Sequence, residues 1–222
     1  MKSLALGTGL VVVSLCFSGV TQAATIYNNG GPAVTNLGGS VMSDTKQAQD
    51  FLLTGITNLT GVRFWNLQGT TADYAGNIFY QIFSDASGLP GVTAIASGLV
   101  TPTRIAAGTV LGFSQFQNDF TIAVNGLTAG TYWLALHNGP TTTTAFNDFY
   151  WSWADLNAVN TPTNPGAEFV LNPAGTSWTT NDQEAAFLLS GSTVGTSTPE
   201  PATFVFVGAS LMALGIYRRR LS

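Results

Sequence analysis

The feature that most constrains the fold of this chain is a series of short segments in which apolar and polar residues alternate. The clearest segment is Gly130–Asn138 (GTYWLALHN), bounded like the others by Gly or Asn. In an extended strand, Tyr132, Leu134 and Leu136 point to one side, and Thr131, Trp133, Ala135 and His137 to the other. This pattern predicts half-buried β-strands, and it differs from the strand–helix alternation of a parallel α/β fold.

Nine further segments carry the same period of two between turn residues: Gln49–Thr54, Gly61–Asn66, Asn77–Ser84, Ile95–Val100, Val110–Ser114, Asp119–Val124, Asn147–Trp153, Glu168–Leu171 and Ala185–Leu189. Short strands separated by Gly, Pro and Asn turns are typical of sandwiches and jelly rolls. We therefore predict an all-β ectodomain over residues 24–191, folded as an antiparallel, jelly-roll-like β-sandwich.

The first 23 residues have the three parts of a secretory signal peptide. Lys2 provides a charged start, Leu4–Val20 forms an apolar core, and Thr21-Gln22-Ala23 ends in small residues. We expect an N-terminal signal helix that is removed by cleavage between Ala23 and Ala24. The apolar core is shorter than the ~20 residues that a spanning helix needs, which argues against an uncleaved anchor.

A second apolar segment, residues 202–217 (ATFVFVGASLMALGIY), is followed directly by Arg218, Arg219 and Arg220. An apolar helix that ends in a basic cluster leaves its arginines on the cytoplasmic side of a membrane. A helix of this length rises ~24 Å, and local thinning of the bilayer accommodates the difference from a ~30 Å hydrocarbon core. We predict a transmembrane helix over 202–217 rather than a buried helix of the ectodomain.

Pro199-Glu200-Pro201 stands just before this helix, and its prolines hold the backbone extended. The order of this motif, the apolar helix and the arginine cluster over residues 199–222 resembles the PEP-CTERM sorting signal. The resemblance implies that an exosortase, a membrane-embedded transpeptidase-like enzyme of Gram-negative bacteria, cuts the tail near the motif. It also implies transient anchoring in the inner membrane with the ectodomain in the periplasm, followed by transfer to the cell envelope or extracellular matrix. Residues 192–198 (STVGTST) are predicted to form a flexible linker.

The ectodomain is acidic and has few charges. The ectodomain has ten acidic residues and only three basic ones, Lys46, Arg63 and Arg104, which gives a net charge of −7. Nucleic acid and anionic lipid headgroups both require clustered Lys or Arg, so neither is an expected partner. The only cysteine, Cys16, lies in the signal peptide. Thiol chemistry, disulfides and cysteine metal sites are therefore excluded from the mature domain.

The ectodomain contains few residues of the types that catalyse hydrolysis. His137 is the only histidine, and no Gly-x-Ser-x-Gly elbow or ectodomain cysteine accompanies it. A catalytic triad or a zinc site would have to be built around it, so we expect His137 to be a sandwich-surface or strand-end residue. Glu168 and Glu184 are the only glutamates of the ectodomain. Glycoside hydrolysis needs two carboxyl groups across a cleft, which keeps a glycosidase-like enzyme as an alternative.

Two tryptophans offer a candidate binding surface. Trp151 and Trp153 lie two residues apart on one predicted strand, with Phe149 on the same face. Exposed tryptophans stack on sugar rings, which makes this pair a candidate ligand platform. Alternating aromatics on one strand face also fill sandwich cores, so that interpretation stays open. Calcium stays open as well: loop-end carboxylates are available at Asp148, Asp155 and Asp182, but no known spacing defines a ligand set, and no cofactor is assigned.

Together these features predict an exported, non-enzymatic envelope or extracellular-matrix protein that an exosortase sorts. Adhesion or contact with exopolysaccharide is a function that fits this predicted location. A secreted carbohydrate-active enzyme and a purely structural matrix component are the two alternatives. Exposure of Trp151 and Trp153, and the distance between acidic side chains, distinguish the three hypotheses.

Overall fold

The fold is all-β, as predicted. A computed structural model of the chain describes residues 23–142, 145–155, 169–171, 178–180 and 183–194. Every strand in these ranges belongs to one of two antiparallel sheets. The only helical segment described is the 3-10 turn η1 (Thr71–Asp73). No helix in the described ranges has the length and apolar content to cross a membrane, and the segment 202–217 lies outside them.

The larger sheet is built around one long strand, β4. Its strands are β1 (Ala24–Asn28), β2 (Gly39–Val41), β4 (Thr57–Gln68), β7 (Thr103–Val110), β8 (Phe113–Leu127), β10 (Phe149–Ser152) and β13 (Phe187–Thr193). One edge of β4 pairs with β8 along its whole length, while β13 and β10 pair with it in succession. β1, β2 and β7 extend the sheet outward from β13, β10 and β8.

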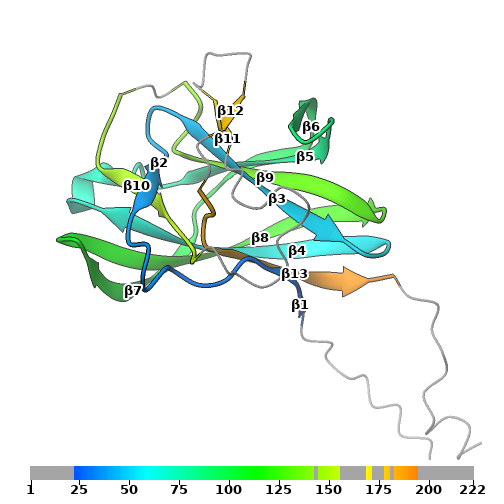
Figure 1. The fold of residues 1–222 in the computed structure, drawn as a ribbon, viewed down its shortest axis with the longest axis horizontal. Helices are drawn as coiled ribbons and strands as arrows, with labels where there is room; N and C mark the ends of the chain where they lie inside the picture. The colour runs from blue at the N-terminus through cyan, green and yellow to red at the C-terminus, as the bar shows by residue number, and fades with distance from the viewer. Residues whose placement is uncertain (1–22, 143–144, 156–168, 172–177, 181–182, 195–222) are drawn as a thin grey trace, which may run out of the picture.

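The second sheet has six strands. In spatial order they are β12 (Thr179–Thr180), β11 (Phe169–Leu171), β3 (Lys46–Leu53), β9 (Gly130–Asn138), β5 (Ile78–Asp85) and β6 (Pro90–Val100). This sheet lies over the seven-stranded one, with β3, β9 and β5 above β4 and β8 in Figure 1. The two layers give the molecule a sandwich-like form.

The core lies between the two sheets. The six-stranded sheet contributes Phe51 and Leu134, and the seven-stranded sheet contributes Phe64, Trp151 and Phe187, all fully buried. The predicted alternation along β9 is confirmed, because Tyr132, Leu134 and Leu136 all belong to this core. The opposite face of β9 is covered too: Trp133 and Ala135 form a second apolar cluster with Ala48 and Phe83.

One predicted strand and one predicted linker boundary are wrong. The segment Val110–Ser114 is not one strand: Val110 ends β7, Phe113 begins β8, and Leu111 and Gly112 form the hairpin turn between them with φ values of 52° and 87°. Two residues with positive φ form the tight turns that match the twist of antiparallel strands. At the other boundary, Ser192 and Thr193 continue β13 by pairing with Asn58 and Thr57.

The two ends of the described domain lie side by side. Ala24, at the start of β1, pairs with Gly191 near the end of β13. We call this the tether end of the sandwich, because the start of β1 and the end of β13 meet there. The opposite end, the far end, is formed by the residues around Gln68, where β4 stops, and Asn138, where β9 stops.

Candidate functional site

The structure overturns the proposed platform at Trp151. Trp151 is 0% exposed, and its indole packs edge to face against Phe64 and Phe187 at 6.1 and 5.8 Å between ring centroids. Its Nε1 atom donates a hydrogen bond to the carbonyl oxygen of Ala186 at 2.9 Å. A side chain enclosed in this way cannot stack on a sugar. Trp151 is a core residue because β10 turns its apolar face toward the other sheet.

Trp153 lies in a different environment from Trp151. It is half-buried, and its Nε1 atom donates to Ser40 Oγ at 2.8 Å. Its ring covers Gly38 so closely that a Cβ atom there would lie 2.3 Å from Cζ3. The ring of Trp153 therefore packs against Gly38 and the adjoining strand β2. The two tryptophans do not form an exposed pair.

His137 lies at the end of β9, as one of the two predicted positions had it, but it is buried rather than on the surface. It is 0% exposed, and its Nδ1 atom lies 2.9 Å from the carbonyl oxygen of Gly139. Burial lowers the pKa of the imidazole, with the positive charge of Lys46 acting in the same direction. The neutral ring therefore prevails at pH 7, and its Nδ1 atom faces a backbone carbonyl oxygen rather than a serine hydroxyl or a carboxylate.

Two acidic side chains do come together, although only one was predicted. Asp50 on β3 and Glu184 are each 2% exposed. Burial, assisted by the negative charge of Glu184, raises the pKa of Asp50 to about 7. Asn29 Nδ2 donates a hydrogen bond to Glu184 Oε2 at 2.7 Å. Glu168, the expected partner of Glu184, lies outside the described residues.

The outer surface of the seven-stranded sheet presents a different set of polar and aromatic side chains. On β4, Arg63 and Trp65 point away from the core, because Phe64 between them is fully buried. On β8, Asp119 lies opposite Arg63 and Gln117 lies opposite Trp65. We call these four residues the β4–β8 face.

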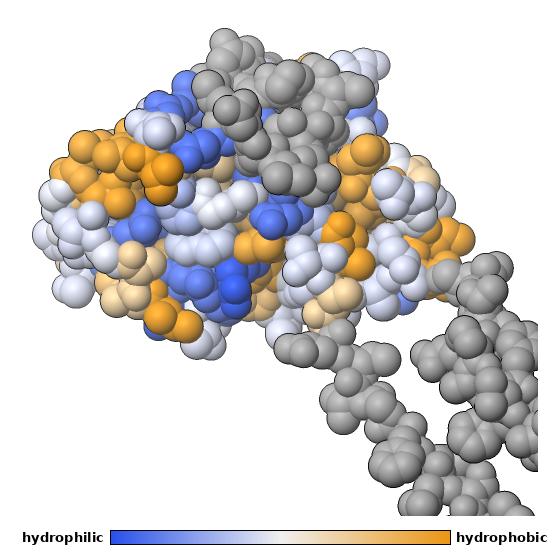
Figure 2. All heavy atoms as spheres, turned by 60° about the horizontal axis from the view of Figure 1, so that its bottom comes forward, coloured by the Kyte–Doolittle hydropathy of each residue, from blue (hydrophilic) through white to orange (hydrophobic). Residues whose placement is uncertain are grey.

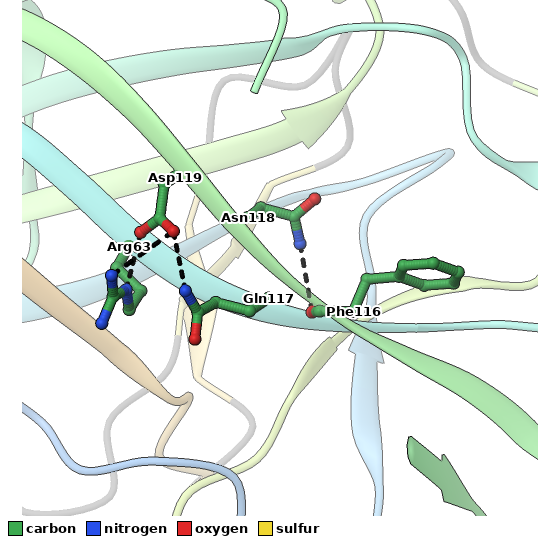
Figure 3. A network of polar contacts seen from close by, with 5 residues as sticks. All are labelled: Arg63, Phe116, Gln117, Asn118 and Asp119. Atoms are coloured by element: carbon green, nitrogen blue, oxygen red, sulfur yellow. Dashed lines mark hydrogen bonds and ion pairs between the residues drawn. The ribbon is translucent and has the colours of Figure 1, made fainter. Parts of the chain in front are cut away.

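The polar groups of the β4–β8 face are held by direct contacts, shown in Figure 3. Arg63 Nε donates to Asp119 Oδ1 at 2.6 Å, and Gln117 Nε2 donates to Asp119 Oδ2 at 2.7 Å. The Arg63 side chain is 46% exposed and that of Asp119 is 31% exposed. An ion pair in this setting adds little stability but fixes the direction of both planar groups.

A shallow groove continues from this pair toward the tether end. It is lined by Thr60, Arg63, Asp119, Thr121, Leu188 and Ser190, together with residues of β1. Figure 2 turns this side of the molecule forward and shows hydrophilic and weakly polar residues over its middle, with hydrophobic residues toward its flanks. Trp65 is half-buried, with Gln117 opposite it on β8 and Arg63 two residues away on the same side of β4.

This arrangement suits a flat, hydroxyl-rich ligand. An aromatic ring attracts the CH faces of a pyranose, while the planar Arg, Asp and Gln groups can exchange hydrogen bonds with its hydroxyls. Sequence reasoning did not single out Trp65. The signal was present, because Trp65 is in phase with the charged Arg63 in the segment Gly61–Asn66, and a residue in phase with a charge belongs to the solvent face.

The remaining predicted residues have these positions. Ala23 and Ala24 are exposed at the start of β1. Asp155 accepts hydrogen bonds from Thr35 and from backbone N–H groups of residues 34–36, which lower its pKa. Asp148 accepts from the Tyr150 hydroxyl at 2.7 Å. Asp182, Pro199, Glu200, Pro201 and the arginines 218–220 lie outside the described residues.

Comparison with protein-family models, with curated proteins and with solved structures finds no match to this chain.

Proposed function

We propose that this chain is an exported, non-enzymatic protein of the cell envelope or extracellular matrix that an exosortase sorts and that contacts polysaccharide. It consists of a jelly-roll-like sandwich between a cleaved signal helix, residues 1–23, and a transmembrane helix, residues 202–217. The sorting part of the proposal is carried by Pro199-Glu200-Pro201 before an apolar segment that ends in three arginines. The contact with polysaccharide is carried by Trp65 on the polar β4–β8 face.

The position of the chain ends supports display from a membrane. The start of β1 and the end of β13 are paired strands at the tether end. A tail that follows β13 into the inner membrane would leave the far end of the sandwich pointing away from the bilayer. The β4–β8 face runs along the side of the sandwich, where a membrane anchored at the tether end does not cover it.

The composition of the face indicates the class of ligand. The ectodomain has three basic residues and a net charge of −7, so an anionic polymer would be repelled. A neutral polysaccharide needs no cation and binds through ring stacking and hydroxyl hydrogen bonds, which Trp65, Gln117 and Arg63 can provide. We therefore propose a neutral or weakly charged exopolysaccharide as the partner.

Processing at both ends tests the sorting proposal. In the native host, mass spectrometry of the mature protein is expected to give an N-terminus at Ala24 and to lack Arg218, Arg219 and Arg220. The reason is that both apolar helices act as targeting signals in the membrane, and cleavage releases the ectodomain from them. Intact chain ending at Ser222, recovered from cells with an active exosortase, would contradict the C-terminal half of the proposal.

Substitution of Trp65 tests the contact surface. The variant Trp65→Ala is expected to lose retention on a column of host exopolysaccharide while its melting temperature changes little, because the ring lies on the outer face. Base–aromatic stacking in nucleic-acid-binding proteins contributes about 1–3 kcal/mol per ring, and a similar loss here lowers affinity by roughly 5- to 150-fold.

Phe146→Ala is the matched control. Phe146 is an aromatic residue with 60% exposure that lies near the far end, away from the β4–β8 face. We expect this variant to be retained like the unmodified protein. Equal retention of Trp65→Ala and Phe146→Ala would reject the β4–β8 face as the contact and favour a purely structural matrix component.

The glycosidase alternative receives no support from the acidic pair. Asp50 and Glu184 are both 2% exposed, so a sugar ring cannot enter between them without unfolding the chain around them. Glycosidases require their two carboxyl groups to line an open cleft. On the β4–β8 face, Asp119 is the only carboxylate among the four residues, and its two oxygens are already engaged by Arg63 and Gln117.

A further inference from the structure

Three buried oxygen atoms at the far end of the sandwich have no hydrogen-bond donor. They are Asp44 Oδ1, Asn77 Oδ1 and Asn147 Oδ1. Each comes from a different loop, before β3, before β5 and before β10. A buried acceptor without a donor costs about 1–3 kcal/mol, and more when the group is charged, so three such atoms at one end need an explanation.

Backbone contacts bring the three loops together. Asn147 N donates to Ser43 Oγ at 2.9 Å, which places Asn147 beside the residue that precedes Asp44. Asn138 N donates to the carbonyl oxygen of Met42 at 2.7 Å, and Gly139 N donates to that of Asn77 at 2.9 Å. The turn at Asn138 therefore lies between the Asp44 loop and the Asn77 loop.

His137 lies among the same loops and is wholly buried. Its Nδ1 atom is 2.9 Å from the carbonyl oxygen of Gly139, while its Nε2 atom has no partner. Ser43 and Asp44 are among its electrostatic neighbours. The far end thus encloses a fourth polar atom that the protein itself does not satisfy.

The three oxygen atoms are better satisfied by a cation than by a single water molecule. Carboxylate and amide oxygens are acceptors, and a single water can donate to only two of them. A hard divalent cation can bind all three oxygen atoms at once, and it also compensates the negative charge of Asp44. Ca²⁺ takes six to eight oxygens from carboxylates, Asn side chains, backbone carbonyls and water, in flexible geometry.

We propose that the far end of the sandwich is a calcium site in which Asp44, Asn77 and Asn147 supply side-chain oxygens. No group of three or more His, Cys, Asp or Glu side chains suited to a metal is present in the described ranges. The site therefore depends on amide oxygens, which calcium accepts and which zinc disfavours. Backbone carbonyls and water complete the coordination.

The surrounding charges favour a cation. Asp73 Oδ2 and Asp148 Oδ2 both lie beside Gly69, about 3 Å from where its Cβ would be. Asp44, Asp73 and Asp148 all raise the pKa of the Tyr150 hydroxyl, after the effect of burial. The nearby basic side chains bind neutral amide oxygens outside the proposed ligand set: Lys46 Nζ donates to Gln81 Oε1, and Arg104 donates to Asn66, Gln68 and Asn118.

Thermal unfolding of the full chain in detergent tests the site. After treatment with EDTA, addition of millimolar CaCl₂ is expected to raise the melting temperature by several degrees, and MgCl₂ by less. Asp44→Asn is expected to abolish the calcium-induced rise. Asn147→Asp adds a carboxylate and is expected to lower the Kd for calcium by about tenfold, measured by titration calorimetry.

Asp155→Asn is the control, because Asp155 is an exposed loop carboxylate that caps residues 34–36 instead. It is expected to retain the full calcium-induced rise. The proposal is overturned if CaCl₂ does not change the melting temperature of the unmodified protein, which would leave ordered water at the far end. It is also overturned if Asn147→Asp binds calcium no more tightly, or if ZnCl₂ stabilises more than CaCl₂ and His137→Gln removes that effect.

Discussion

Replacing Trp151 by alanine is expected to lower the free energy of unfolding by about 3–5 kcal/mol, the usual cost of truncating a buried aromatic residue. Trp151 is fully buried, packs against Phe64 and Phe187, and donates to the carbonyl oxygen of Ala186. Its loss leaves a cavity between the two sheets and an unpaired buried carbonyl group. Urea denaturation of the protein and the variant measures the difference.

Trp65→Ala is the control for this experiment. Trp65 belongs to β4, which pairs with β10, but it lies on the outer face and its removal opens no core cavity. We expect the free energy of unfolding of this variant to stay within about 1 kcal/mol of that of the unmodified protein, because the substitution opens no core cavity. If Trp151→Ala were as stable as Trp65→Ala, the packing of β10 against the core described above would be wrong.

Replacing Asp50 by asparagine is expected to stabilise the protein much more at pH 8 than at pH 5. Burial and Glu184 raise the pKa of Asp50 to about 7 in the folded protein, above the ordinary value of 3.8. Between these two values the folded state holds a proton that the unfolded state has released. The stability that Asp50 contributes is therefore fully present below about pH 4 and is lost as the pH rises through about 7.

The size of this effect follows from the linkage relation. Each pH unit within the window changes the free energy of unfolding by about 1.4 kcal/mol, so the buried carboxylate costs on the order of 4 kcal/mol above pH 7. Asparagine has nearly the same shape and no charge to bury, so Asp50→Asn removes most of this cost.

The comparison of two chains at each pH isolates Asp50 from other groups. His137 has a lowered pKa, so its protonation destabilises the folded state below about pH 6.5 and opposes the effect of Asp50. That contribution is the same in Asp50→Asn and in the unmodified protein, and it cancels in their difference. A stability difference that is equal at pH 5 and pH 8 would show that Asp50 does not titrate in this window.

The positions of most strands were predictable from the sequence because alternation is a local property. The segment Gly130–Asn138 coincides with β9, and the segment Asn77–Ser84 is displaced from β5 by a single residue. β1, β2 and β7 were missed because they are edge strands of the seven-stranded sheet. β7 illustrates the difficulty: it is largely exposed and carries small residues at Ala106, Ala107 and Gly108, so no apolar face marks it.

The tryptophans show where local pattern stops being informative. Trp65, Trp151 and Trp153 all lie in or beside strands, yet they are respectively a surface residue, a core residue and a half-buried cover over β2. A period of two says which residues share a face, and it does not say which face meets the other sheet. For Trp65 the in-phase charge of Arg63 supplied that information, whereas the strand Asn147–Trp153 has no charged residue in phase with Trp151.

The sequence by itself determined the all-β class, the faces of β9, the low positive charge and the two apolar ends with their motifs, because each of these is a property of neighbouring residues. Only the tertiary structure placed Asp50 beside Glu184, buried His137, and gathered Asp44, Asn77 and Asn147 at the far end. These groups come from segments many residues apart, and their proximity follows from the order in which the strands pair. Strand order is decided by the packing of the whole core, which no single segment encodes.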